Sequence, residues 1–357
     1  QLMWSMGFIS LVITAFVYAC KYWILHGVFG QIEADVMHHA DVYLLIVTAS
    51  IPFIALYNGG AAVFRAMGNS EVSMKVSLLM NAINVSGNAI LIYGFHCGTE
   101  GVAIPTLVSR FVAAFIIIKL LLKDKWSLHL ERTYRFNPDW SMIRKILSVG
   151  IPNGLENSMF QLGKVLVLSL VSTFGTYAIA ANAVSNVITL FSILPGQAIC
   201  LAVTTVIARC VGAGDYEQAK YYNKKLILLT HIGMAITIFI VFITLPFILK
   251  VYNLSEAASE ATRHIIWFHG FCAILIWAES FTLPATFRAC GDAKACMIIS
   301  TVSMWIFRVG ASYILGKNLG LGVFGVWVAM IIDWAFRSLL FGIRYFSGKW
   351  KKHALVS

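Results

Sequence analysis

Long apolar stretches dominate this chain, and about ten of them reach roughly 20 residues, the length that an α-helix needs to cross a bilayer. Hydrophobic residues make up 59% of the 357 residues and charged residues only 12%, a balance that excludes a soluble domain of this size. The predicted spans are 3–25, 41–65, 72–95, 101–122, 147–174, 177–208, 224–249, 264–288, 295–316 and 322–344. The sequence therefore predicts an all-α fold, a polytopic membrane helix bundle.

The basic residues, which give a formal net charge of +11, lie between the apolar stretches and do not form one patch. Nucleic acid is therefore not an expected partner, and the lipid bilayer is. Most lysines and arginines fall in alternate loops, and the opposite loops hold only Lys21, Lys250, Arg263 and Lys317. By the positive-inside rule the basic loops face the cytoplasm. We expect a monomeric, multi-pass protein of the cell (inner) membrane whose polar stretch 124–146 and C-terminus are cytoplasmic.

The second half of the sequence nearly repeats the first. Phe-Arg-Ala-Met-Gly-Asn closes one apolar stretch at 64–69, and Phe-Arg-Ala-Cys-Gly-Asp closes another at 287–292. Each is followed by an apolar span, a Gly-rich hairpin and a Gly-Val pair, which begins at Gly101 in one half and at Gly325 in the other. A duplication of this kind predicts two pseudo-symmetric lobes, an arrangement typical of transporters that hold their cargo between the halves.

The repeat also predicts the domain boundaries. The expected segments are an N-lobe of four spans at 1–123, an interlobe linker at 124–146, a C-lobe of six spans at 147–345 and a C-terminal tail at 346–357. Since six spans follow the linker and four precede it, the simplest expectation is a natural total of twelve, with two spans before Gln1.

Three passages together resemble the multidrug and toxic compound extrusion (MATE) family. They are the repeated Phe-Arg-Ala-x-Gly-Asn/Asp signature, Ala-Ala-Asn-Ala-Val-Ser-Asn at 180–186, and Ile-Ala-Arg-Cys-Val-Gly-Ala-Gly-Asp at 207–215. The resemblance implies two six-helix lobes, a central cavity, and efflux of organic cations driven by entry of protons or sodium ions. It implies no cofactor besides that coupling ion. The family's counterpart of 207–215 in the first lobe is absent from this sequence.

A carboxylate inside the membrane is the expected coupling group, because it binds cations and because desolvation favours its protonated form. Glu156 is the first candidate, since it follows Pro152 in a predicted span and a charge at the bilayer centre costs roughly 2.5–3.5 kcal/mol. The family's carboxylate on this helix lies about eight residues after the proline, so Glu156 matches it by region only. Polar residues repeat beside Glu156 at i, i+4, i+8 and i+11: Asn153, Asn157, Gln161 and Lys164. This stripe is expected to face the cavity or to join helices by hydrogen bonds.

Other deep charges supply further candidates in the C-lobe. Lys164 needs a partner from another span, because the eight residues between it and Glu156 rise about 12 Å; Glu279 and Asp333 are the expected choices. Glu279, which precedes a proline, also resembles the family's second C-lobe cation site. Asp333 is as well explained by a structural pair with Arg308.

Asn182 and Asn186 lie one turn apart before Pro195, and they either line the cargo path or pack between helices. Arg65 and Arg288, the arginines of the repeated signature, are expected to anchor helix ends at the cytoplasmic surface without contacting cargo.

These features favour a secondary antiporter that exports organic cations or drugs in exchange for protons or sodium ions by alternating access. The alternative within transport is a flippase for a lipid-linked oligosaccharide, which would need a strongly cationic cavity for phosphate. A membrane enzyme would need clustered His, Cys, Ser or Asp residues at catalytic or metal-binding spacing, which the sequence does not show. A fragment that does not transport on its own is the remaining alternative.

Overall fold

The computed structural model describes residues 1–28, 34–130 and 138–353. The chain divides into two compact units, 1–144 and 145–357. Their boundary lies within the expected linker 124–146, of which residues 131–137 are outside the described part of the chain. Residues 354–357 of the expected tail are outside it as well. Each unit is described by itself below.

The first unit is a bundle of helices in which α5 packs against its neighbours α2, α3 and α4. Its elements are α1 (Leu2–Trp23), which continues as the π-helix η1 (Ile24–Val28), α2 (Ala34–Ala49), α3 (Ile51–Ala66), α4 (Ser70–Ala89), its π-helical continuation η2 (Ile90–Gly94), and α5 (Glu100–Leu121). The span expected at 41–65 lies within one candidate membrane span, Asp35–Ala66, which is interrupted only at Ser50 between α2 and α3, because Pro52 cannot donate a backbone hydrogen bond.

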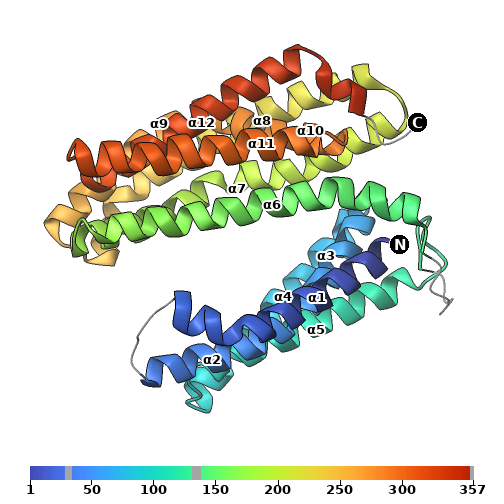
Figure 1. Cartoon of the computed structure of the whole chain (residues 1–357), viewed down its shortest axis with the longest axis horizontal. Coiled ribbons are helices and arrows are strands. Elements are labelled where there is room, and N and C mark those ends of the chain that lie inside the picture. Colours follow the sequence, from blue (N-terminus) through green and yellow to red (C-terminus); the bar gives the residue numbers. More distant parts are fainter. Residues whose placement is uncertain (29–33, 131–137, 354–357) are drawn as a thin grey trace. The chain divides into compact units, whose positions relative to one another are not determined.

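Among the described residues, the longest helices, of 37 residues each, belong to the second unit (Figure 1). Its elements are α6 (Trp140–Ser172), α7 (Thr176–Gly212), α8 (Tyr216–Tyr252), α9 (Glu256–Trp277), η3 (Ala278–Thr282), α10 (Leu283–Ala289), α11 (Ala293–Ser303), η4 (Met304–Gly310), η5 (Tyr313–Asn318), α12 (Gly322–Phe346) and η6 (Lys349–His353). Helix α6 begins before the boundary of the unit, so its first residues, Trp140 to Arg144, fall within the range 1–144. Helix α7 packs against both α8 and α9, and α9 packs against α12.

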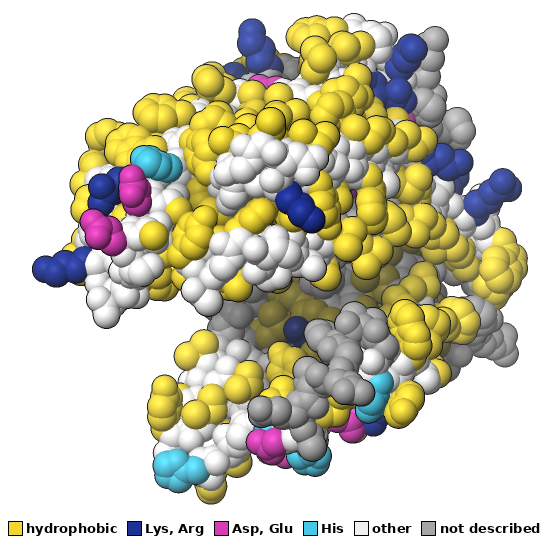
Figure 2. Space-filling view, turned by 60° about the vertical axis from the view of Figure 1, so that its left-hand side comes forward, with side chains coloured by type: hydrophobic (Ala, Val, Ile, Leu, Met, Phe, Trp, Pro, Cys, Tyr) yellow, Lys and Arg dark blue, Asp and Glu magenta, His cyan; other side chains and the backbone are white. Residues whose placement is uncertain are grey.

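Nine helical segments of the described residues are long and apolar enough to cross a membrane. Helix α6, which corresponds to the expected span 147–174, is not among these nine segments. It has sufficient length at 33 residues but carries charged residues at its start and middle. Large apolar side chains remain exposed on the outer faces, as at Phe239, Ile243 and Phe247 on successive turns of α8. Figure 2 shows hydrophobic side chains covering most of the visible face of the second unit. The all-α, multi-pass membrane class predicted from the sequence is confirmed.

The repeated signature forms the same helix end in both units. The backbone N–H of Asn69 donates to the carbonyl of Phe64 at 2.9 Å, and the N–H of Asp292 donates to the carbonyl of Phe287, also at 2.9 Å. The glycine before each donor has a positive φ, 81° at Gly68 and 87° at Gly291, which side chains with a Cβ rarely adopt. The sequence repeat is therefore a repeat of local structure.

Gly325 lets α12 lie directly against η5. A Cβ at this position would lie 2.8 Å from the backbone carbon and oxygen of Leu315, whereas a Cβ at Gly342 on the same helix would meet nothing within 4 Å. Gly325→Ala is expected to destabilise the protein by about 2 kcal/mol, because backbone cannot move aside for the added methyl group. Gly342→Ala, the matched control, should be neutral or slightly stabilising. Unfolding of both variants in detergent micelles measures the difference, and equal stabilities would contradict this close packing.

Candidate functional site

The inward face of α6 positions the first candidate, Glu156. Pro152, Glu156 and Gly163 are the buried residues in the middle of the helix, and a Cβ at Gly163 would lie 2.4 Å from the methyl carbon of Met304. This close contact holds the Glu156 side chain within the second unit. The carboxylate is buried there and does not face solvent.

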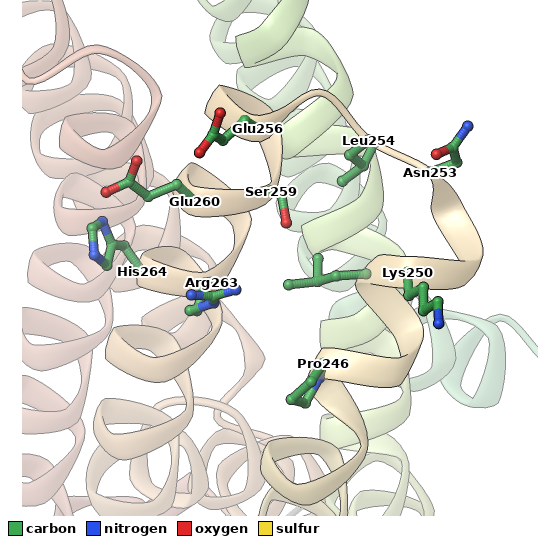
Figure 3. A pocket seen from close by; sticks show the side chains of 10 residues that line it. Pro246, Lys250, Asn253, Leu254, Glu256, Ser259, Glu260, Arg263 and His264 are labelled. Atoms are coloured by element: carbon green, nitrogen blue, oxygen red, sulfur yellow. The ribbon is translucent and has the colours of Figure 1, made fainter.

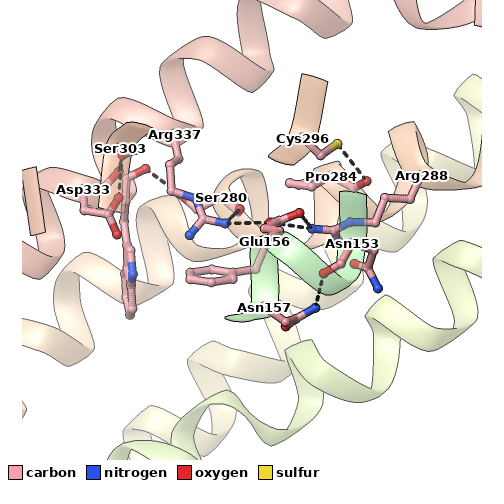
Figure 4. Close-up of polar contacts among 12 residues, drawn as sticks. Asn153, Glu156, Asn157, Ser280, Pro284, Arg288, Cys296, Ser303, Asp333 and Arg337 are labelled. Atoms are coloured by element: carbon pink, nitrogen blue, oxygen red, sulfur yellow. Dashed lines mark hydrogen bonds and ion pairs between the residues drawn. The ribbon is translucent and has the colours of Figure 1, made fainter. Parts of the chain in front are cut away.

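Glu156 is already paired with two arginines, as Figure 4 shows. Nη2 of Arg288 donates to both carboxylate oxygens at 2.8 Å, and Nη2 of Arg337 lies 4.0 Å from Oε1. Arg337 is 3% exposed; it also donates to the carbonyl of Ser280 at 3.4 Å and lies over the ring of Phe281. The expectation that Arg288 only anchors a helix end at the surface is therefore wrong, because its guanidinium points inward to Glu156.

The polar stripe of α6 lies on a different face from Glu156. Asn157, Gln161 and Lys164 are exposed and Asn153 is half-buried, and the Asn157 amide donates to the Asn153 carbonyl of its own helix at 2.8 Å. Consecutive residues of an α-helix are about 100° apart, so the exposed Asn157 and Gln161 point to a different side of α6 from Glu156. The structure thus brings together Glu156 and the arginines, and it leaves Asn157 and Gln161 outside that cluster.

Glu279 lies in the π-helix η3 and faces His231 of α8. Its Oε1 is 2.9 Å from Nε2 of His231, and Nδ1 of the same ring is 2.6 Å from the carbonyl oxygen of Ile274. The other carboxylate oxygen, Oε2, is buried without a hydrogen-bond partner. Glu279 therefore does not pair with Lys164, the partner expected for that lysine.

Asp333 is fully buried on α12, where Ser303 donates to its Oδ1. The expected direct pair with Arg308 is not formed, because the guanidinium of Arg308 instead donates to Sδ of Met330 at 3.1 Å. Lys164 likewise has no carboxylate partner among the described residues; its Nζ lies over the ring of Phe160, 5.0 Å from the centroid.

An open cavity of about 230 Å³ lies within the second unit, between α6, α7, η4 and α12. Its polar lining combines three residues proposed as candidates from the sequence with one arginine. The polar lining residues are Lys164, Asn182, Asn186 and Arg308, and the apolar ones are Val167, Leu168, Val326, Trp327 and Met330. None of these lining residues is acidic.

A second, wider pocket of about 710 Å³ lies where α8 meets α9 (Figure 3). Glu256 and Glu260 of α9 and Lys250 of α8 line it, so its charges are of both signs. It opens at the start of α9, and its lining residue nearest to Glu279 along that helix, His264, is still roughly 22 Å away from it. Among the described residues, no group of three or more His, Cys, Asp or Glu could hold a metal ion.

Three residues of these contacts were not predicted from the sequence: Arg288, Arg337 and His231. Arg288 had a usable signal, since it belongs to the repeated signature and is the first deep cation after Glu279. Arg337 lies one turn after Asp333 on α12, a spacing that places both on one helix face. His231 had no signal, because a single histidine within an apolar span is not distinctive.

The chain is similar to known membrane proteins. The MatE family model matches residues 1–90 and 152–314. The chain is 26% identical over 339 residues to the probable multidrug resistance protein NorM of Thermotoga maritima, which covers 94% of this chain and 72% of that protein. It is 27% identical over 352 residues to the uncharacterized transporter YisQ of Bacillus subtilis, covering 96% of this chain and 75% of that one.

A solved structure shares the fold. It is an outward-facing conformation of a multidrug resistance MATE family transporter of the MOP superfamily, and it matches with a TM-score of 0.88. The match covers 98% of this chain and 79% of that one at 19% sequence identity. At this identity the likeness supports the fold and says nothing of individual site residues.

Proposed function

Since the chain belongs to the MatE family of multidrug efflux transporters, we propose that it is a secondary antiporter that exports drug-like organic molecules, organic cations among them. Entry of protons would drive export, with sodium ions as the alternative coupling ion. The transporter would work by alternating access, in which binding of ion or cargo shifts the population of two conformations. The observation that carries this proposal is the contact of Glu279 with His231.

The proton count of this contact follows from its hydrogen bonds. The Ile274 carbonyl can only accept, so Nδ1 of His231 carries a proton. The 2.9 Å contact between Nε2 and Oε1 then needs one further proton, held either by the imidazole or by the carboxyl group. Without it, a lone pair of the ring would face a carboxylate oxygen. The contact is therefore stable only while one exchangeable proton lies between the two groups.

Loss of that proton would release η3 from α8. The π-helical turn at Glu279 and the proline at Pro284 already weaken the regular hydrogen bonding of this segment. A change of protonation at one side chain can therefore change how two long helices pack, which is what proton-coupled alternating access requires.

Glu156 receives a different role in this proposal from the one expected from the sequence. Its carboxylate is bound by Arg288, and a coupling cation would have to displace a buried guanidinium. We assign Glu156 to holding Arg288 and Arg337 in place. The exposed amides Asn157 and Gln161 remain candidates for contacting cargo.

Transport into proteoliposomes tests the proposed function. Ethidium accumulation is followed under an imposed proton gradient, under an imposed sodium gradient, and with both gradients collapsed. We expect accumulation under the proton gradient alone, and its loss when an ionophore collapses that gradient. Accumulation driven only by sodium would transfer the coupling to sodium ions, and no accumulation under either gradient would contradict the antiporter.

The cellular location, oligomeric state and partners of the protein belong to the same proposal. The distribution of lysine and arginine supports a cell-membrane protein with its linker and C-terminus in the cytoplasm. We propose that it acts as a monomer in the lipid bilayer, binds no nucleic acid, uses no cofactor besides the coupling ion, and catalyses no chemical reaction.

A second candidate function is the flipping of a lipid-linked oligosaccharide. The observation that favours it is the cavity lined by Lys164 and Arg308, whose positive charges suit the phosphate of such a lipid. A fluorescent lipid-linked sugar in the same proteoliposomes distinguishes the functions. Flipping without any ethidium accumulation would replace the antiporter with the flippase.

A further inference from the structure

The cavity of the second unit has the wrong charge for an organic cation. We propose that it binds an anionic group, a carboxylate or a phosphate carried on a small apolar body, as one end of the cargo. Calling this ligand cargo rests on the proposed function, but its binding is measured below without transport. Failure of the site and failure of the antiporter are therefore distinguishable.

Two unpaired cations face the cavity from different helices. Lys164 projects from α6 and Arg308 from η4, and both line it. Their charged groups lie over the same ring, Phe160, at 5.0 Å and 5.1 Å from its centroid. Among the described residues neither has a carboxylate within 4 Å. Two like charges held near one ring repel each other, so an anion that binds between them is favoured over a cation.

The side-chain amides of α7 add a hydrogen-bond donor to the lining of the cavity. Nε1 of Trp327 donates to Oδ1 of Asn182 at 3.1 Å, which occupies the amide oxygen and leaves the amide N–H groups free to donate. Nδ2 of Asn186 donates to the Asn182 carbonyl one turn earlier. The polar wall therefore presents donors from a lysine, an arginine and an amide, the groups that bind carboxylate and phosphate in proteins.

The apolar lining residues and the size of the cavity define the rest of the ligand. Val326 and Met330 of α12 supply buried apolar surface. At about 230 Å³ the cavity is smaller than the roughly 300–1,000 Å³ of sites that enclose a whole drug-sized molecule. It suits a group of the size of benzoate, with any larger part of the ligand outside.

Three fluorinated probes of similar size test this site by ¹⁹F NMR titration of the protein in detergent micelles: 4-fluorobenzoate, 4-fluorophenyl phosphate and 4-fluorobenzylammonium. We expect at least one anion to bind about tenfold more tightly than the ammonium. A tenfold ratio of dissociation constants corresponds to the net contribution of one charge-assisted hydrogen bond. Preference for benzoate identifies a carboxylate site, and preference for the phosphate identifies the chemistry of the second candidate function. Equal or tighter binding of the ammonium overturns the proposal.

Substitutions of lining residues test whether the anion binds in this cavity. Lys164→Gln should weaken the preferred anion about tenfold. Lys225→Gln is the matched control, because Lys225 is also exposed on its helix and lies over the aromatic ring four residues earlier, Tyr221, at 4.5 Å. Equal losses in both variants would show binding through general surface charge and would overturn the site.

Asn182→Asp provides a second variant that keeps the fold. An aspartate oxygen can still accept the indole N–H of Trp327, so the contact between α7 and α12 is retained. The new negative charge should weaken the anion and strengthen 4-fluorobenzylammonium, reversing the order of the probes. An unchanged order in a folded variant would contradict the proposed position of the ligand.

Discussion

Glu156→Gln is expected to destabilise the protein by about 3–5 kcal/mol, the cost of removing one partner from a buried ion pair. The substitution keeps the size of the side chain but leaves Arg288 without a counter-charge, and it removes the carboxylate 4.0 Å from Arg337. Nε and Nη1 of Arg337 already lack a hydrogen-bond partner, so no described group takes over. Unfolding by sodium dodecyl sulfate in mixed micelles measures the loss.

Glu217→Gln in the same unit is the matched control. Glu217 also pairs with a cation, Lys220 at 2.6 Å, but its side chain is 79% exposed. An exposed pair contributes about 0.2–1 kcal/mol, so this variant should remain close to the wild type. Equal effects of the two substitutions would show that the Glu156 contact does not stabilise the second unit.

Combining Glu156→Gln with Arg288→Met measures how much of the stability loss comes from the interaction between these two residues. If the cost of the single variant is an unpaired Arg288, removing that guanidinium should recover part of the stability. Recovery should be incomplete, because Arg337 is 3% exposed and keeps its charge in the double variant. A double variant with the summed losses of the single variants would contradict a direct interaction.

The fold was largely predictable because its signals are local. Span length and apolar content follow from the thickness of the bilayer. The repeated signature follows from one helix end that needs a glycine of positive φ, at Gly68 and again at Gly291. The interruption at Ser50 between α2 and α3 does not show in the hydropathy of this span, but it follows from Pro52, which cannot donate a backbone hydrogen bond.

The candidate site was less predictable because its contacts join residues far apart in the sequence. Glu156 and Arg288 are 132 positions apart, and although the repeated signature singles out Arg288, no local pattern indicates that it pairs with Glu156. The face of α6 was also ambiguous, since Glu156 lies on one side and the stripe through Asn157 on another, and both are polar. Only packing decides which side is buried. Glu156 is held inward by the close approach of Met304 to Gly163.

Glu279→Gln is expected to abolish proton-driven accumulation of ethidium, down to the level of liposomes without protein. Glutamine can still hydrogen-bond to Nε2 of His231, so the contact between η3 and α8 is kept. It cannot take up or release a proton, so the contact no longer opens when the shared proton is lost. The variant should therefore fold, with a loss of about 1 kcal/mol at most, and fail to couple. Its residual ethidium flux should not vary with pH.

Glu260→Gln is the control for this effect. Glu260 lies on the same helical segment as Glu279, Glu256–Ala289, but its side chain is exposed at the pocket between α8 and α9. It undergoes the same chemical change and should retain proton-driven accumulation. His231→Gln should lose coupling as Glu279→Gln does, since an amide in place of the imidazole can donate to the ionised carboxylate and the contact no longer depends on a shared proton. Proton-driven accumulation that survives Glu279→Gln would remove the coupling role from this contact. The family assignment would stand, and the search for the coupling group would turn to the buried carboxylates of the described residues, Glu156, Asp292 and Asp333.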